Sequence, residues 1–171
     1  LEALEEQVVL LRLLGGASSG MQVRIGSEQS EENLRETSVI SIGYGEVGKA
    51  TEARLLPFGC SVLPFATTPR DHVRAVAQVP DFLPSADVVV LAVPLNETTH
   101  HLVDHRFIAL MKPGSLLVNV ARGPVVDTDA LVAALHAGTI QAALDVTDPE
   151  PLPVDHPLCW SPAAPPAAHP V

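Results

Sequence analysis

Short apolar runs alternate with amphipathic segments from Thr37 to about residue 146. Five of the runs have the length and composition of strands, and they cover residues 38–42, 61–65, 87–93, 115–120 and 142–146. Apolar residues recur with helical spacing over 46–56 and 127–136, and a short helix is expected to end over 107–111. Because strands and helices alternate with short connections, the pattern predicts an α/β fold with a doubly wound, Rossmann-like parallel sheet.

The two ends of the chain follow a different pattern. A helix is expected over residues 2–14, where one face carries Leu4, Val8, Leu11 and Leu14. Residues 16–36 are polar and lack a period, which is typical of a connector, and the end of the chain is rich in proline. We therefore expect three parts: a helix and connector over 1–36, one folded domain over 37–150, and an irregular tail over 151–171.

The composition fits one packed domain with a reduced, soluble character. Of the 171 residues, 47% are apolar and 18% are charged, and the formal net charge is −10. Such an acidic chain repels phosphate backbones and anionic lipids, which argues against nucleic-acid and membrane partners. The apolar runs are too short to span a bilayer. Cys60 and Cys159 have neither metal-ligand spacing nor the density of a disulfide scaffold, so we expect a cytoplasmic protein without a metal site.

A glycine motif, Gly43-Tyr44-Gly45-Glu46-Val47-Gly48, lies between the first expected strand and the first expected helix. In a dinucleotide site, Gly43 would allow a tight turn, Gly45 would admit a pyrophosphate, and Gly48 would let the helix pack closely. The amide groups of the helix N-terminus would then bind the anion. An ordinary glycine-rich turn is the alternative, but the position between strand and helix favours a dinucleotide-binding domain over 37–150. Glu46 fits only if its carboxylate turns outward.

No acidic residue stands at the position that usually binds the hydroxyl groups of the adenosine ribose. Dinucleotide sites place Asp or Glu at the end of the second strand, about 20 residues after the glycines. That position falls near Ala66, and Arg70 follows shortly afterwards. An arginine suits a 2′-phosphate better than a 2′-hydroxyl, so the choice between NAD and NADP leans toward NADP. An exposed loop arginine explains Arg70 equally well.

Asn119 and Arg122 stand at the end of a strand that Leu116, Leu117 and Val118 would bury. Ligands of open α/β sheets bind at the carboxyl ends of the strands. A guanidinium held there can grip a planar carboxylate through two parallel hydrogen bonds. The pattern thus predicts an anion site beside the nucleotide site.

Three segments in order, 82–99, 111–127 and 142–151, resemble signatures of the D-isomer-specific 2-hydroxyacid dehydrogenases. The resemblance covers about residues 39–158. It implies an NAD(P)-dependent oxidoreductase acting on the CH–OH group of small D-2-hydroxy acids, for example in the reduction of glyoxylate or hydroxypyruvate. Its partners would be a nicotinamide dinucleotide and a small 2-keto or 2-hydroxy acid. Relatives pair through a helical region of this domain, so a homodimer is compatible with the resemblance.

The resemblance also implies roles for single residues. Arg122 matches the arginine that binds the substrate carboxylate and keto oxygen, and Glu150 matches the partner of a catalytic histidine. Asp145 matches the carboxylate near the nicotinamide carboxamide. Taken alone, Asp145 is equally explained as a turn cap and Glu150 as solvated surface. Residues lining the nicotinamide and adenosine pocket, largely through their backbone, would be Val93, Val120 and Ala121.

The catalytic histidine and the second domain are where the sequence departs from the family. His169 follows Glu150 by nineteen residues, near the family separation, but Pro162, Pro165 and Pro166 cannot belong to the strand that carries this histidine in the family. The family forms its substrate domain from both ends of the chain, and we expect that domain to be largely absent here. A catalytically silent NAD(P)-binding module, or an incomplete fragment of such an enzyme, is the alternative function.

Overall fold

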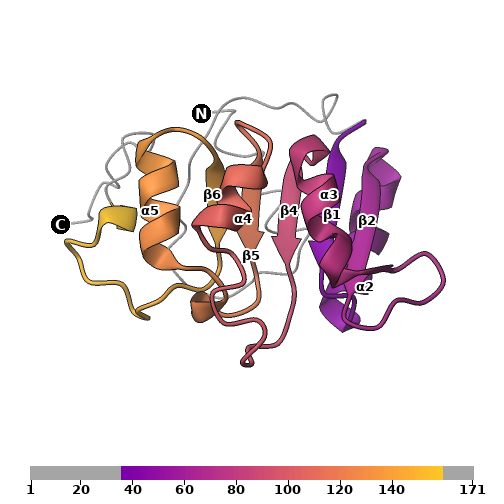
Figure 1. Ribbon diagram of the computed structural model, residues 1–171, viewed down its shortest axis with the longest axis horizontal. Helices are drawn as coiled ribbons and strands as arrows, with labels where there is room; N and C mark the ends of the chain where they lie inside the picture. The colour runs from indigo at the N-terminus through magenta and orange to yellow at the C-terminus, as the bar shows by residue number, and fades with distance from the viewer. Residues whose placement is uncertain (1–35, 160–171) are drawn as a thin grey trace.

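The computed structural model describes residues 36–159 of the chain, and they form one parallel sheet flanked by helices (Figure 1). The strand order in the sheet is β3-β2-β1-β4-β5-β6, with every neighbouring pair parallel. The chain builds outward from β1 to β3, returns to place β4 beside β1, and builds outward again to β6. This is the doubly wound α/β fold that the sequence pattern predicts. The expected helix over 2–14 and His169 lie outside the described residues.

The strands are short, and their bounds are β1 (Ser38–Ile42), β2 (Ser61–Ala66), β3 (Arg74–Ala75), β4 (Val88–Leu91), β5 (Leu116–Asn119) and β6 (Gln141–Leu144). The α-helices are α2 (Glu46–Leu55), α3 (Val79–Phe82), α4 (His105–Leu110) and α5 (Thr128–His136). Single 3₁₀ turns lie at Leu56–Phe58, Val76–Gln78, Leu83–Ser85, Gly123–Val125 and Pro157–Cys159.

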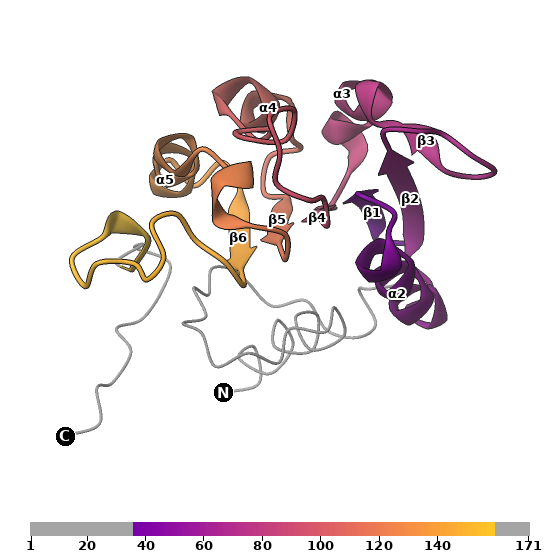
Figure 2. The ribbon, with the colours of Figure 1, turned by 90° about the horizontal axis from the view of Figure 1, so that it is seen from below.

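Alternation along each strand divides its side chains between the two faces of the sheet. In β4, Val89 and Leu91 join one buried cluster, whereas Val88 and Val90 join another. All four are buried, as is typical of a parallel strand that is covered on both faces. Figure 2 shows α3, α4 and α5 on one face and α2 on the other. The near-continuous apolar run that predicts this strand is thus a consequence of double coverage.

The helices pack through stripes of apolar or small residues. In α5 the buried residues are Ala130, Leu131, Ala134 and Leu135, which recur with helical spacing. In α2 they are Gly48, Thr51 and Leu55. The carboxylate of Asp104 caps α4 by accepting from two backbone amides, and the carboxylate of Asp127 caps α5 by accepting from one, that of Ala130.

The structure corrects the sequence prediction in the segment between β2 and β4. The predicted pattern has no strand there, but Arg74 and Ala75 form β3 opposite Phe65 and Ala66. Two residues are too few to produce an alternating pattern, so this edge strand has no signal of its own. Strand β4 ends at Leu91 rather than at residue 93, although the Ala92 amide still donates to the Ile42 carbonyl of β1 at 2.8 Å.

Two further observations concern the described residues. No helix among them combines the length and the apolar character needed to cross a bilayer. Burial raises the pKa of the Cys60 thiol, which therefore stays protonated at neutral pH.

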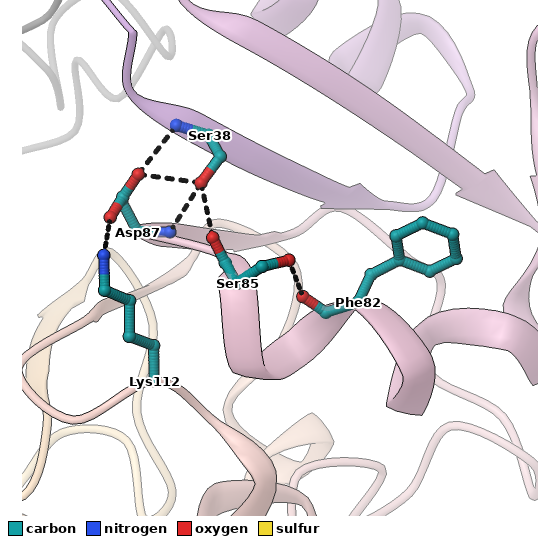
Figure 3. Close-up of polar contacts among 5 residues, drawn as sticks. All are labelled: Ser38, Phe82, Ser85, Asp87 and Lys112. Carbon is teal, nitrogen blue, oxygen red and sulfur yellow. Dashed lines mark hydrogen bonds and ion pairs between the residues drawn. The ribbon is translucent and has the colours of Figure 1, made fainter.

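A polar network ties together the amino-terminal ends of the central strands (Figure 3). Asp87 Oδ2 accepts hydrogen bonds from the backbone amide of Ser38 at 2.8 Å and from its hydroxyl at 2.7 Å. Lys112 Nζ lies 2.6 Å from Asp87 Oδ1, and the Ser38 hydroxyl donates to the Ser85 carbonyl at 2.7 Å. Ser38 opens β1, Asp87 precedes β4, and Lys112 precedes β5. One carboxylate therefore joins three neighbouring segments of the sheet.

The network stabilises the ionised form of Asp87. Burial alone would raise the pKa of this carboxyl group, but the hydrogen bonds from Lys112 and Ser38 outweigh burial and leave the pKa below its ordinary value. A carboxyl group whose pKa is lower in the folded protein contributes stability above its unfolded pKa. That contribution is lost as the pH falls through the folded pKa.

We therefore expect Asp87→Asn to lower the free energy of unfolding by about 1–3 kcal/mol at pH 7, because it leaves Lys112 and Ser38 without a charged acceptor. Urea unfolding at pH 7 and at successively lower pH measures the difference. The difference from wild type should shrink as the wild-type carboxylate is protonated. Asp155→Asn, at an exposed carboxylate, is the matched control and should change stability by about 0.5 kcal/mol or less. An equal loss in both variants would contradict the role of the network.

Candidate functional site

A pocket of about 430 Å³ lies where the carboxyl ends of β4 and β5 meet the first turn of α2. Strands β1 and β4 are neighbours at which the chain reverses its direction of growth, and open α/β sheets bind ligands at such a point. The lining residues come from α2 and from the segments that follow β4 and β5, and they are Val47, Ala92, Val93, Pro94, Leu95, Val120, Ala121 and Arg122.

Two glycines allow three segments of backbone to meet beside this pocket. Gly43 has a φ of 101°, and a Cβ there would lie 2.3 Å from the carbonyl oxygen of Ala92. A Cβ on Gly48 would lie 2.2 Å from the carbonyl oxygen of Gly43. Any side chain at either position would overlap backbone atoms, which cannot move aside as a flexible side chain can. As a result, α2 begins directly beyond the end of β1.

The amino-terminal end of α2 is free to meet an anion. Its N-cap is Gly45, which offers no side-chain hydrogen bond to the first-turn amides, and a Cβ at this position would have no neighbour within 4 Å. The Glu46 carboxylate lies 3.0 Å from Lys49 Nζ, and the Glu46 side chain is 92% exposed. The Glu46 carboxylate thus turns outward, as it must if a phosphate group is to bind at the start of α2. Open space and unused amide donors fit a pyrophosphate.

Arg122 is held at the pocket by a buried asparagine. The Asn119 side chain accepts a hydrogen bond from the Ala121 amide at 3.0 Å and donates to the Arg122 carbonyl at 3.0 Å. Asn119 is 1% exposed, so these two bonds fix the turn after β5 from within the fold. The Arg122 side chain is exposed, and its Nη1 donates to the Ala121 carbonyl at 2.6 Å. Sequence reasoning noted Asn119 at the strand end but did not assign it this positioning role.

The turn after Arg122 is also braced from the side of β4. The His101 amide donates to the Pro124 carbonyl at 2.9 Å, and the Val103 amide donates to the Val125 carbonyl at 3.1 Å. The Asp127 amide in turn donates to the Val103 carbonyl at 2.9 Å. The segment between β4 and α4 therefore supports the turn that begins at Arg122.

A close backbone contact brings the segment after β6 to the same turn. A Cβ on Gly123 would lie 1.9 Å from the carbonyl oxygen of Thr147, and the Thr128 hydroxyl donates to the Asp148 carbonyl at 2.7 Å. The carboxylates of Asp145 and Glu150, on either side of this contact, belong to exposed residues. Within residues 36–159, neither is hydrogen-bonded to Arg122. The segment is near the arginine turn, while the carboxylates face solvent.

Arg70 lies at the other end of the site, in the loop between β2 and β3. Its Nη2 donates to the carbonyl oxygen of Tyr44 at 3.0 Å, and the residue is exposed. Tyr44 stands between Gly43 and Gly45, so the guanidinium lies directly beside the glycine turn.

The structure thus distributes the sequence-predicted residues over one edge of the sheet. Five of them line the pocket together: Val47, Val93, Val120, Ala121 and Arg122. The three motif glycines and Arg70 lie beside the pocket at the β1–α2 turn, and Glu46 points away from it. Asp145 and Glu150 follow β6, adjacent to the Arg122 turn. None of the described histidines lines the pocket, and no group of three or more possible metal ligands is found among the described residues.

A six-stranded doubly wound sheet with a glycine turn at its switch point defines a nucleotide-binding domain of the Rossmann class. The chain belongs to the D-isomer specific 2-hydroxyacid dehydrogenase family, whose NAD binding domain matches residues 12–169. The family consists of oxidoreductases, and its domain binds a nicotinamide dinucleotide.

Relatives share the domain over only part of their own length. The glyoxylate reductase of Thermofilum pendens is 41% identical over 132 residues, which are 73% of this chain and 39% of that protein. A Xanthobacter autotrophicus Py2 D-isomer specific 2-hydroxyacid dehydrogenase, solved with NADPH and MES, is 34% identical with a TM-score of 0.68, and the match covers 78% of this chain and 57% of that one. A Staphylococcus aureus NAD-dependent formate dehydrogenase, solved with NAD, is 31% identical with a TM-score of 0.69, covering 80% of this chain and 42% of that one. The chain thus spans between 39% and 57% of the length of these relatives.

The glycine geometry separates folding from binding. We expect Gly48→Ala to lower the free energy of unfolding by about 1–3 kcal/mol, because the new methyl group overlaps the Gly43 carbonyl. Gly45→Ala should change the free energy of unfolding by less than about 1 kcal/mol, because open space surrounds the position. It should nevertheless weaken NADH binding, because the new methyl group would occupy the space proposed for the pyrophosphate. Urea unfolding and NADH fluorescence titration measure the two effects. A Gly45→Ala variant that binds as wild type does would contradict a pyrophosphate at this turn.

Proposed function

We propose that this chain is the cofactor domain of an NAD(P)-dependent reductase that converts small 2-keto acids, such as glyoxylate, to D-2-hydroxy acids. The observation that carries the proposal is the shared pocket, in which Arg122 lies with Val47 of the helix that the glycine turn begins. A group that binds carboxylates and a group that binds dinucleotides therefore face one space. The named activity of the Thermofilum pendens relative supports glyoxylate as a substrate to test.

Arg122 is proposed to hold the acid substrate. Its guanidinium is exposed, its backbone is fixed by Asn119, and a bidentate grip on a carboxylate would require only that Nη1 leave the Ala121 carbonyl. In that position it would also offset the negative charge that develops on the keto oxygen. The nicotinamide, when bound, supplies the hydride.

The proton would come from a histidine paired with Glu150. A carboxylate beside an imidazole favours the charged form, which can protonate the keto oxygen. We propose His169 for this role on its separation from Glu150, and we propose Asp145 as the group near the nicotinamide carboxamide. The fold supports these assignments indirectly, because the segment that carries Asp145 and Glu150 packs against the Arg122 turn.

Turnover tests the proposal. The 171-residue chain should oxidise NADH or NADPH in the presence of glyoxylate or hydroxypyruvate. Arg122→Ala should lower kcat/KM by about 100-fold or more, and Arg122→Lys should recover little of the loss, because lysine cannot form the bidentate contact. Glu150→Gln and His169→Ala should each lower the rate by a similar factor.

Arg106→Ala, which removes an exposed arginine from α4, is the matched control and should leave the rate unchanged. Nucleotide binding without turnover by the wild-type chain would contradict the reductase assignment for this chain and favour a catalytically silent binding module.

We also propose that NADP is preferred over NAD. No carboxylate stands at the end of β2, where Ala66 replaces the acid that would bind the ribose hydroxyls. Arg70 is an exposed residue beside the glycine turn, and the N–H groups of its guanidinium can donate hydrogen bonds to a 2′-phosphate. Solved relatives hold either nucleotide, as the Xanthobacter and Staphylococcus structures illustrate.

Titration with NADPH and NADH tests this preference directly. Wild type should bind NADPH more tightly, and Arg70→Ala should reduce the ratio of NADPH to NADH affinity by about tenfold, the value of a hydrogen bond to a charged group. Arg54→Ala, at an exposed arginine of α2, should keep the wild-type ratio. A wild-type ratio that favours NADH would refute the preference for NADP.

A further inference from the structure

Two residues of one tight turn contact Tyr44, one at its backbone carbonyl and the other at its side-chain hydroxyl. Arg70 Nη2 donates to the Tyr44 carbonyl at 3.0 Å, and His72 Nε2 lies 3.1 Å from the Tyr44 hydroxyl. The Tyr44 hydroxyl also donates to Glu52 of α2, and the His72 ring meets the Tyr44 ring edge-on with centroids 5.4 Å apart. We call Tyr44, Glu52, Arg70 and His72 the Tyr44 clamp.

Arg70 and His72 belong to one tight turn, which two backbone hydrogen bonds close. The Arg70 amide donates to the Val73 carbonyl at 3.1 Å, and the Val73 amide donates back to the Arg70 carbonyl at 2.7 Å. Asp71, at the tip, adopts a φ of 45°. Both hydrogen bonds fix the backbone, so a contact made by His72 also constrains the position from which the Arg70 side chain starts.

The protons of the clamp can be assigned from its geometry. The hydrogen bond to Glu52 raises the pKa of Tyr44 to about 12, so the hydroxyl keeps its proton and donates a hydrogen bond to the carboxylate. The hydroxyl then has no second proton for His72. Nε2 of His72 must therefore carry a proton and donate it toward the Tyr44 oxygen and toward Glu52 Oε1, which lies 3.4 Å away.

The Glu52 side chain is well placed to anchor this arrangement. It is 15% exposed, and its carboxylate accepts a hydrogen bond from the Tyr44 hydroxyl and lies near the N–H group of His72 in the β2–β3 loop. Three elements therefore meet at one carboxylate: the glycine turn, α2 and the loop that carries Arg70. Removing the charge of Glu52 would loosen the loop without touching the guanidinium itself.

From this arrangement we infer that Tyr44, Glu52 and His72 are positioning residues that hold Arg70 at the ribose end of the nucleotide site and so set the selectivity between phosphorylated and unphosphorylated dinucleotides. The inference rests on the proposed preference for NADP and extends it to residues that do not touch the phosphate. Selectivity depends on the guanidinium being held beside the glycine turn before the nucleotide arrives, since a side chain already ordered loses less entropy on binding.

The groups that surround His72 come from three elements. They are Tyr44 of the glycine turn, Glu52 of α2, and Arg70 and Asp71 of its own turn. The contact of His72 with the Glu52 carboxylate therefore joins the loop to α2.

The test is the ratio of NADP⁺ to NAD⁺ affinity, measured by calorimetric titration of the full chain. Tyr44→Phe, which keeps the ring, and Glu52→Gln, which keeps the shape, should each lower the ratio about three- to tenfold. His72→Gln replaces the imidazole by an amide whose N–H group starts from a different position, and it should lower the ratio about two- to fivefold.

His136→Gln is the matched control, since it removes an exposed histidine from the end of α5, and its ratio should equal that of wild type. Thermal melts monitor folding, and if Tyr44→Phe does not fold, Glu52→Gln and His72→Gln carry the test. The inference is overturned if these variants keep the wild-type ratio while Arg70→Ala lowers it, an outcome that leaves the proposed function intact. Equal losses for both nucleotides would also overturn it. Binding of neither nucleotide by wild type would remove the proposed function and the inference together.

Discussion

The site depends on backbone contacts that leave no room for a Cβ atom. Gly48 lies against the carbonyl of Gly43, and Gly43 lies against the carbonyl of Ala92. These two contacts bring the end of β1, the start of α2 and the end of β4 to one point. The first-turn amides of α2 consequently face the switch point of the sheet and have no side-chain cap. In α4 and α5, by contrast, an aspartate side chain accepts hydrogen bonds from the first-turn amides. A third contact of this kind, between Gly123 and Thr147, places the segment after β6 against the Arg122 turn.

The two edges of the sheet have different tasks. At the amino-terminal edge, Asp87 uses its oxygens on Ser38 and Lys112, so its hydrogen bonds stabilise the fold. At the carboxyl edge, the guanidiniums of Arg122 and Arg70 are exposed and donate to carbonyl oxygens of their own domain. Donors bound to neutral carbonyls can exchange them for an anion at a modest free-energy cost, because a charged acceptor makes the stronger hydrogen bond. The carboxylate of Asp87 is therefore committed to the fold, whereas the two guanidiniums can exchange partners.

Much of the fold was predictable, because a parallel strand buried on both faces is written in the sequence as a continuous apolar run. In β4, for example, the neighbouring residues Val89 and Val90 belong to the cores on opposite faces of the sheet. The glycine turn and Arg122 were predictable as well, since each stands at a strand end in the linear sequence. Contacts between distant residues were not. Glu52 and His72 lie 8 and 28 residues from Tyr44, and no local pattern relates them. The role of Asn119 was hidden for another reason: a buried asparagine is recognised only when its two backbone partners are known.

The formal charge of −10 makes the location of the site a consequence of short-range forces. An acidic protein repels an anionic dinucleotide at long range, but that repulsion is screened beyond about 8 Å at physiological ionic strength. Inside that distance the sheet edge presents amide donors of α2 and the guanidiniums of Arg70 and Arg122, while Glu46 is turned toward Lys49. The helix amides and the two exposed guanidiniums therefore lie at one edge of the sheet, where short-range attraction for phosphate groups can outweigh the long-range repulsion.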